Sequence, residues 1–520
     1  MLALIVLTLG ACSSDDTMLS AEDSEPCLTL RLSLGREIGM LRGSSNPTGG
    51  EIGDGLEAGV HHENDINNLC VFKFNAGTDG INGPYDTPAQ KLAYVDGIDF
   101  APEVDQFSPE IITHDVPLKN VQYEYTNNDH FIVVVNSGNI LGENTTLGAI
   151  RDHLMQKPWT ASANGVKADF TDFTMANADD SYYTPGNNTA ANPRTVHVNL
   201  ERTAARIDFA IDGSVVKGDR REYEVHGTSG SKVLLSHVRP FNVMQEPTYM
   251  IKRLAADDTQ VPSYVGDEEN PAVQYVVEPH TWLKTDDGKT EAILNQWYDK
   301  SRLPKTEEAY ATWFNNDYKV HVGSGHAFTD GVTYDNLFHN TFYVVDYANE
   351  NTATIDDTDG KVTTGIKLKA TFVPGTVYTY DGNELTAVSY TAGTTFYRYQ
   401  PVTDSDNYND ESNLYFLTYE DADAYKTNHP EEMAKITEYT NGLCYYTAWL
   451  RHDRQYDANN ETIGKNMMEF GIVRNNIYRL KVEFSGPGSN TPVTDEDPEA
   501  IRSYIYVKKW NYIEHPEIEI

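Results

Sequence analysis

The stretch CLTLRLSL, from Cys27 to Leu34, alternates between apolar and polar residues along most of its length. Successive side chains of a β-strand point to opposite faces, so the four leucines of this stretch share one face. They are Leu28, Leu30, Leu32 and Leu34. The stretch therefore predicts a strand whose leucine face is buried against a core.

Other strand patterns recur through the first half of the chain. Two apolar runs, Asn68–Phe74 and His130–Asn136, predict buried strands. The alternating stretch Thr195–Gly213 predicts one or two strands that close an N-terminal domain. The best helical pattern is Thr145–Gln156, which has a threonine cap followed by apolar residues at helical spacing. Strand signals therefore dominate.

A second series of strands follows Ser214–Glu222, which is the expected boundary between two domains. The strand-like stretches are REYEVHG, KVLLSHVRPFNVMQ, NTFYVVDYA, GIKLKATFVP, TTFYRYQPV, CYYTAWLR and NIYRLKVEF. Long polar insertions such as Leu254–Asp299 lie between them. We expect a mostly β fold with two β-sandwich domains, few helices and long loop insertions.

Charge and cysteine content exclude several classes of protein. The chain has 520 residues, with 40 Lys+Arg against 78 Asp+Glu, a net charge of −38. So acidic a surface repels phosphate backbones, and we expect no nucleic-acid partner. The four cysteines, Cys12, Cys27, Cys70 and Cys444, have no metal-binding or redox spacing. A disulfide scaffold is not indicated.

The N-terminus, MLALIVLTLGACSSDD, has the features of a signal peptide. The apolar run Leu2–Leu9 is too short to span a bilayer and is followed by small residues and Cys12. LTLGAC resembles a bacterial lipobox, which implies that residues 1–11 are removed and Cys12 is lipidated. No Lys or Arg precedes the apolar run, and the alternative is an ordinary signal peptide with an incidental cysteine. Membrane attachment would then be by lipid alone.

Motifs of catalysis or cofactor binding are weak. The Gly-Lys-Thr at 288–290 lacks the P-loop glycine five residues earlier, where Leu283 stands. The acidic stretch 356–360 lacks the later Glu of a calcium loop. We therefore expect no enzyme activity, no cofactor and no metal site. Three tryptophans of the insertions, Trp282, Trp297 and Trp313, could form a sugar-stacking face, but packing in a core or an interface is favoured.

The C-terminal segment predicts one more strand after a linker. Ser503, Ile505 and Val507 fall on one face, and Trp510 lies further along the other. The linker before it contains three prolines and the acidic run DEDPE, a composition that favours an extended chain. Two interpretations stay open. The strand completes the sheet of another subunit, or it folds into its own domain.

Several motifs together resemble the Bacteroidales fimbrillins. GLCYYTAWLR (Gly442–Arg451), FGIVRNNIYRLKVEFSGPG (Phe470–Gly488) and the ending with Ile505, Val507 and Trp510 resemble the C-terminal region of that family. ERTAARIDF (Glu201–Phe209) is similar to its strand closing the N-terminal domain. The nearest match is the minor-fimbrium (Mfa-type) major-subunit family of type V fimbriae. The Arg-Asn-Asn-x-Tyr element is the most specific part.

The resemblance implies two transthyretin-like Greek-key β-sandwiches and a route of assembly. A lipoprotein precursor reaches the outer membrane, and a trypsin-like or Arg-specific protease cuts after Arg42, with Arg36 as the alternative. The first strand leaves and opens a groove. The C-terminal strand of another copy then fills it, so that Ser503, Ile505 and Val507 replace the four leucines. The product is a homopolymer that also meets fimbrial anchor and tip subunits and supports cell adhesion.

These expectations divide the chain into six parts. They are a signal peptide (1–11), a lipidated propeptide with the first strand (12–42), an N-terminal sandwich (43–218), a C-terminal sandwich (219–484), a linker (485–500) and a donor strand (501–520). The function expected is a structural stalk subunit. The alternatives are a tip or accessory fimbrial adhesin and a surface glycan-binding lipoprotein.

Overall fold

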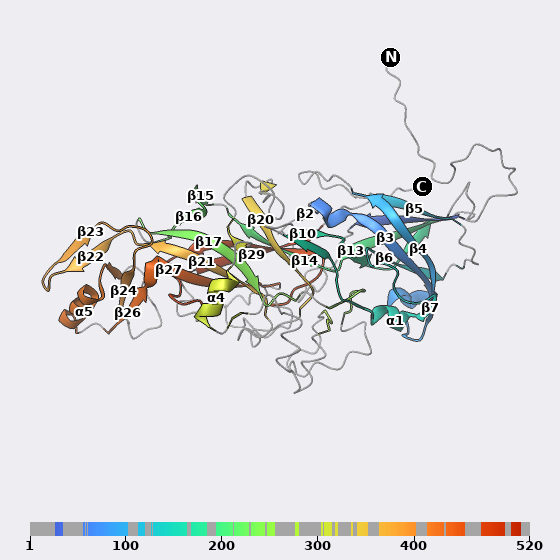
Figure 1. Ribbon diagram of the computed structural model, residues 1–520. Coiled ribbons are helices and arrows are strands. Elements are labelled where there is room, and N and C mark those ends of the chain that lie inside the picture. Colours follow the sequence, from blue (N-terminus) through green and yellow to red (C-terminus); the bar gives the residue numbers. More distant parts are fainter. Residues whose placement is uncertain are drawn as a thin grey trace, which may run out of the picture.

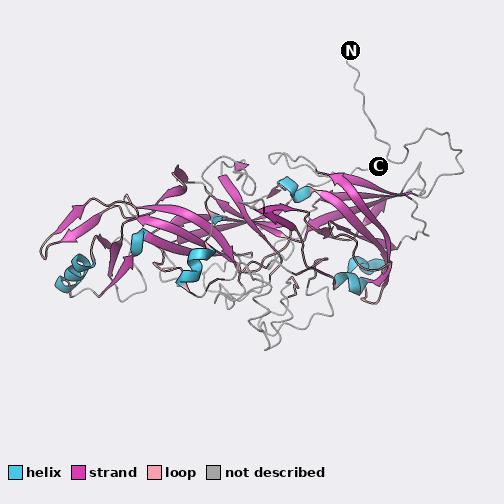
Figure 2. Ribbon diagram, in the orientation of Figure 1, coloured by secondary structure: helices cyan, strands magenta, loops and turns pink. Residues whose placement is uncertain are grey.

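The fold is given by a computed structural model of the chain. It describes residues 27–34, 56–57, 59, 61–101, 113–119, 126, 128–163, 168–184, 194–211, 213–227, 230–244, 247–254, 276–279, 303–304, 306–314, 318–320, 334–335, 341–351, 363–401, 413–430, 433–452, 470–493 and 501–510. Strands dominate these residues and helices are few and short (Figure 2). None of the described helices is long and apolar enough to cross a membrane.

The first sandwich is a nine-stranded sheet that folds over its own core at one end of the molecule (Figure 1). In spatial order its strands are β5 (Thr113–Lys119), β1 (Cys27–Leu34), β13 (Arg194–Arg202), β11 (Met175–Asn177), β6 (Asp129–Val135), β3 (Ile66–Asn75), β4 (Pro88–Phe100) and β7 (Asn144–Thr146), with β12 (Tyr182–Thr184) beside β13. Leucine and valine side chains from β1, β5 and β13 pack there against those of β3 and β6.

The outer face of β3 and β6 carries a second apolar layer. There Phe72 and Val134 pack with Ile150 of the helix α1 (Leu147–Arg151). The runs Asn68–Phe74 and His130–Asn136 therefore have apolar side chains on both faces because both faces are covered. The short helices η1 (His61–Asn64) and η2 (Gly77–Asn82) flank β3.

The predicted helix over Thr145–Gln156 is shorter than expected. Thr146 caps it as predicted, since its Oγ1 accepts a hydrogen bond from the Ala149 N–H. The helix ends at Arg151 because Leu154–Met155 forms β8, which pairs with β18 (Thr248–Tyr249) of a distant segment. Tertiary pairing thus overrides the helical spacing of the last turn. A two-stranded sheet of β9 (Thr160–Ala163) and β10 (Ala168–Thr171) follows.

The second sandwich packs two sheets face to face around the largest apolar cluster. The six-stranded sheet has the order β19 (Tyr334–Asp335), β20 (Thr341–Ala348), β14 (Ala205–Ala210), β28 (Asn476–Phe484), β29 (Ile501–Trp510) and β2 (Leu56–Glu57). The five-stranded sheet has the order β15 (Ser214–Lys217), β16 (Arg220–Glu224), β17 (Lys232–Phe241), β21 (Gly365–Val373) and β27 (Leu443–Trp449). The helix α4 (Glu307–Trp313) covers part of the outer face of the latter.

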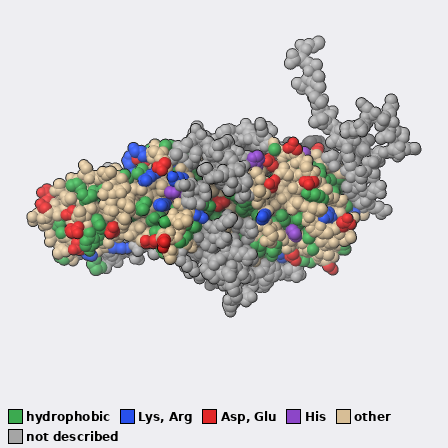
Figure 3. Space-filling view, in the orientation of Figure 1, with side chains coloured by type: hydrophobic (Ala, Val, Ile, Leu, Met, Phe, Trp, Pro, Cys, Tyr) green, Lys and Arg blue, Asp and Glu red, His purple; other side chains and the backbone are tan. Residues whose placement is uncertain are grey.

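A third, smaller sheet lies at the end of the molecule opposite the first sandwich (Figure 1). Its order is β23 (Leu385–Val388), β22 (Val377–Tyr380), β25 (Leu414–Phe416), β24 (Phe396–Pro401) and β26 (Ala434–Tyr439). One face packs on the core of the second sandwich and the helix α5 (Tyr419–Asn428) covers the other. The turn η6 (Thr440–Gly442) leads from β26 to β27. Acidic side chains are spread over this end (Figure 3).

The predicted fold class is confirmed, but the division of the chain at residue 218 differs from the sheets. The strand β14 pairs with β20 and β28, so it belongs to the second sandwich. The change of sandwich therefore falls between Arg202 and Ala205, whereas residue 218 lies in the turn between β15 and β16. The alternation of Thr195–Gly213 is similar in both strands, so the pattern cannot reveal that they enter different sheets.

The core of the second sandwich contains a carboxyl group whose pKa is raised. Asp346 of β20 is only 5% exposed, and burial raises the pKa of its carboxyl group to about 6. The Tyr347 N–H donates to Asp346 Oδ1 over 2.8 Å and opposes this shift. Between about pH 4 and pH 6 the Asp346 carboxyl group is therefore protonated in the folded protein but ionised in the unfolded chain. Stability from this group is lost as the pH rises through that window.

We predict that Asp346→Asn stabilises the protein at pH 7 and has little effect at pH 4. The amide keeps the acceptor for the Tyr347 N–H but has no charge to bury. The gain at pH 7 should be on the order of 2–3 kcal/mol in the free energy of unfolding. Urea unfolding at both pH values measures it, with the exposed Asp219→Asn as control. An equal change at both pH values would contradict the prediction.

Candidate assembly site at the first and last strands

The first strand, β1, is a central strand of the first sandwich. It runs parallel to β13 and antiparallel to β5, and both neighbours pair with it along its length. Leu28, Leu30 and Leu32 are at most 1% exposed and lie in the core. Burial of a leucine side chain stabilises by about 1.5–3 kcal/mol. Removal of β1 would therefore open a long apolar groove between β5 and β13. The backbone of Leu34 pairs with Leu200.

The outer face of β1 carries an ion pair. Arg31 Nε and Nη2 donate to the two carboxylate oxygens of Asp115, on β5, over 2.8 and 2.7 Å. The hydrogen bonds from Arg31 lower the pKa of the Asp115 carboxyl group, although burial opposes the shift. On the other side of Arg31, His197 of β13 is its pairing partner, and its ring stacks on Tyr182 at 4.5 Å. Arg31 thus sits in an ordered row across three strands.

The C-terminal strand, β29, lies in the second sandwich of its own chain. It pairs antiparallel with β28, from Phe484 opposite Ile501 to Asn476 opposite Lys509. On its other side, among the described residues, the short strand β2 pairs with Lys509 and Trp510 alone. The sequence left two interpretations open, and this arrangement corresponds to the second, in which the strand folds into its own domain. Register places Ile505 beside Leu480 and Val507 beside Tyr478, while Ser503 is exposed.

The remaining predicted assembly residues lie outside the described part of the chain. They are Cys12, Arg36 and Arg42. Cys70 and Cys444 are both free thiols in buried positions. Trp313, which was considered for sugar stacking, is 8% exposed and packs with Arg239, whose guanidinium lies 4.2 Å from the ring centroid. Trp313 therefore has a packing role, which the sequence analysis favoured over sugar stacking.

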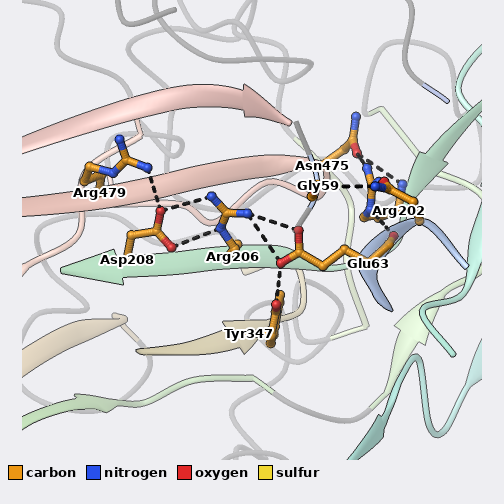
Figure 4. Close-up of polar contacts among 9 residues, drawn as sticks. Gly59, Glu63, Arg202, Arg206, Asp208, Tyr347, Asn475 and Arg479 are labelled. Atoms are coloured by element: carbon orange, nitrogen blue, oxygen red, sulfur yellow. Dashed lines mark hydrogen bonds and ion pairs between the residues drawn. The ribbon is translucent and has the colours of Figure 1, made fainter. Parts of the chain in front are cut away.

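A buried ionic cluster joins the two sandwiches (Figure 4). Arg206, on β14, is fully buried. Its Nε and Nη2 donate to the carboxylate of Asp208, and its Nη1 donates to Oε2 of Glu63, on η1, over 3.0 Å. Arg479 of β28 donates to the same Asp208 over 2.9 Å. The Tyr347 hydroxyl donates to Glu63. Three strands of the second sandwich thus meet a helix of the first around two carboxylates.

Arg202, on β13, forms the other half of this cluster. Its guanidinium donates to the Glu63 carbonyl over 2.7 Å and to the side chains of Asn64 and Asn475 (Figure 4). Burial, together with the charge of Arg206, lowers the pKa of Arg202 to about 10. Gly59 lies so close that a Cβ there would collide with the Asn64 amide. Neither Glu63 nor Gly59 stands out in the sequence, because the chain has 78 acidic residues and 37 glycines.

Two of the motifs that resemble the fimbrillins meet at this junction. ERTAAR contributes Arg202 and Arg206, and the Arg-Asn-Asn-x-Tyr element contributes Asn475. In that element Arg474 donates to Glu350 over 2.6 Å, and the Tyr478 hydroxyl accepts from the Val473 N–H. Asn475 has a φ of 55°, a conformation that asparagine tolerates better than most residues. Of these residues, Arg202 with Asn475 and Arg206 with Glu63 make the contacts that join the two sandwiches.

Comparisons with known proteins agree with the earlier resemblance. Residues 437–515 match the family profile described as "Major fimbrial subunit protein type IV, Fimbrillin, C-terminal". The match runs from within β26 to beyond β29, so the C-terminal part of the chain is similar to the fimbrillins, as predicted. No curated protein sequence matches the chain.

Two solved structures illustrate the similar proteins. The tip fimbrial protein Mfa3 from Porphyromonas gingivalis, with C-terminal truncation, is 10% identical, with 93% of this chain and 100% of that chain covered and a TM-score of 0.33. A fimbrilin (FimA) from Porphyromonas gingivalis W83 is 14% identical, with 94% and 99% covered and a TM-score of 0.34.

We predict that Glu63→Gln destabilises the protein by about 3 kcal/mol, because it leaves three buried guanidiniums with one carboxylate. Urea unfolding measures the change. The matched control is Glu222→Gln, which breaks the Glu222–Lys232 pair, where the lysine is 38% exposed. That variant should lose less than about 1 kcal/mol. Equal, small losses in both variants would refute a special role for the buried cluster.

Proposed function

We propose that this chain, which belongs to the fimbrillin family by its C-terminal segment, is a stalk subunit of a cell-surface fimbrium that polymerises by strand exchange between copies. One observation carries the proposal. The strand nearest the N-terminus is a central strand of one sandwich, while the last strand of the chain has the same alternating pattern and is held mainly by one neighbour. A second copy can therefore supply what the first strand leaves vacant.

The proposed route begins with export. Cleavage of residues 1–11 leaves Cys12 lipidated, and the lipid holds the precursor at the outer membrane. A trypsin-like or Arg-specific protease then cuts after Arg42, or after Arg36 as the alternative. The propeptide departs with β1, and with it the lipid. Anchor and tip subunits would complete the fimbrium, and the role of the stalk is structural rather than catalytic.

The exchange would place the last strand among more neighbours than it has at rest. In the described part of its own chain, β29 pairs along its length with β28 but only at its end with β2. In the groove it would lie between β5 and β13, both of which pair with β1 along most of its length. More of its backbone N–H and C=O groups would therefore be paired. This difference favours the polymer over the resting monomer.

The same strand cannot serve both places, so it must leave β28 before it is donated. We predict that a disulfide between β28 and β29 blocks polymerisation. Lys481 and Tyr504 are direct partners in the ladder. The variant Lys481→Cys/Tyr504→Cys, oxidised and then clipped with trypsin, should stay monomeric because its strand is tethered. SDS-resistant ladders on a gel report polymerisation.

Reduction with dithiothreitol provides the matched control for this variant. It should restore the ladder of the same clipped protein. The buried Cys444, whose thiol pKa burial raises to about 12, should not interfere. Ladders of equal intensity before and after reduction would mean that β29 is not the donated strand.

The choice of cleavage site gives a further prediction. Trypsin should cut the precursor after Arg42, and Arg42→Ala should abolish the ladder, whereas Arg36→Ala should not. Arg31 should resist cleavage, because β1 holds its backbone in a sheet and its guanidinium is bound to Asp115. Mass spectrometry of the clipped chain identifies the new N-terminus. A ladder that survives Arg42→Ala but not Arg36→Ala would move the site to Arg36.

A further inference from the structure

Departure of the first strand leaves Asp115 without its cation. We propose that Asp115 sets the register of the incoming strand by binding Arg502 of a second copy of this chain. The inference rests on the proposed strand exchange. It adds to that exchange a specific pairing residue at the rim of the groove and a defined direction for the donated strand.

The geometry of the Arg31–Asp115 pair supports a recognition role. Both carboxylate oxygens of Asp115 accept from one guanidinium, a planar two-point contact that fixes position as well as charge. The two side chains are 42% and 39% exposed, so the carboxylate lies at the surface of the sheet rather than within the core. It can therefore persist as an open anionic site once β1 has gone.

The charge of the last strand is complementary to this site. Ile501–Trp510 contains Arg502, Lys508 and Lys509 and no acidic residue. The whole chain, by contrast, has 78 acidic against 40 basic residues. Copies of so acidic a protein repel one another, so a cationic strand and an anionic groove rim favour the correct contact over others.

Alternation determines which cation fits. Arg31 points outward between Leu30 and Leu32, which point into the core. A cation that takes its place therefore needs neighbours that can be buried. Lys508 and Lys509 are adjacent, so either one opposite Asp115 would bring the other into a leucine position. Arg502 has Ile501 and Ser503 as neighbours, and its guanidinium can repeat the contact that Arg31 makes.

Alternation also determines the direction of the donated strand. With Arg502 opposite Asp115 and the strand running opposite to β1, Ile501, Ser503 and Ile505 fall where Leu32, Leu30 and Leu28 stood. This register differs from the sequence-based expectation, because Ile501 takes a leucine position and Val507 falls two residues beyond the position of Leu28. A strand that ran in the direction of β1 would bring Glu499 to the position of Leu28, which is 1% exposed, whereas the antiparallel strand brings Glu499 to the position of Leu34, the last residue of β1. A buried, unpaired carboxylate is strongly disfavoured. The donated strand should therefore run antiparallel to β13.

Double-mutant analysis of full-length chains tests the pairing. After trypsin clipping, Asp115→Asn and Arg502→Gln should each slow ladder growth about three- to tenfold, as expected for a partly exposed charge pair. The double variant should be no slower than the slower single variant. Higher salt should slow the wild type but not Asp115→Asn. Asp219→Asn and Lys217→Gln are control variants at exposed sites outside the groove.

A crosslink tests the direction independently of rates. Thr195 of β13 lies opposite Thr29 of β1, and the proposed register puts Tyr504 in the place of Thr29. Clipped Thr195→Cys mixed with clipped Tyr504→Cys should form an intermolecular disulfide. Thr195→Cys with Ala500→Cys, the pair expected for the opposite direction, should not.

The possible outcomes distinguish failure of the Asp115–Arg502 pairing from failure of the strand exchange. Absence of ladders in the clipped wild type would overturn the strand exchange itself. Ladders that grow equally fast with Asp115→Asn, or coupling of Asp115 to Lys508→Gln instead of Arg502→Gln, would overturn the pairing while leaving the exchange intact. A disulfide only with Ala500→Cys would overturn the direction.

Discussion

The fully buried guanidinium of Arg206 is the constraint on which the rest of the structure depends. A charge removed from water is tolerated only where it is paired and hydrogen-bonded, and here Asp208 and Glu63 do both. Those two carboxylates come from different sandwiches. The cluster therefore forms only when η1 of the first sandwich meets β14 of the second, so it specifies how the two are joined as well as stabilising each.

The residues of the ionic cluster would stay in the mature subunit, whereas β1 would be replaced by the strand of another copy. Glu63 follows the proposed cleavage site in the chain, so the cluster would be retained after the propeptide has left. β1 contributes three core leucines and an ion pair at the surface, and none of the hydrogen bonds described above for the cluster involves it. The fold thus places its replaceable strand away from the interactions that hold the two sandwiches together.

The sequence predicted the β class and the buried face of β1, because each follows from a local pattern of residues. The two motifs at the junction stood out only by their resemblance to a family, and their contacts with each other were not predicted. It did not predict that β13 and β14 enter different sheets, since both alternate alike. It could not identify Glu63 among 78 acidic residues, because the partners Arg206 and Tyr347 are distant in sequence. The position of β29 stayed open because one amphipathic strand fits its own sheet and a foreign groove equally well.

In a fimbria under tension, the junction between the two sandwiches would carry the load. In the proposed polymer each subunit is held at the groove of its first sandwich. It pulls on the next subunit through its last strand, which extends from its second sandwich. Load must then cross from β13 to β14, where Arg202 and Ala205 are separated by two residues. Arg202 binds the backbone and side chains of η1 and Asn475 beside this crossing, and Arg206 binds Glu63 just beyond it. Because these contacts bridge the crossing, the sandwiches would separate only by breaking buried charge pairs, and each charge left buried without its partner costs several kcal/mol.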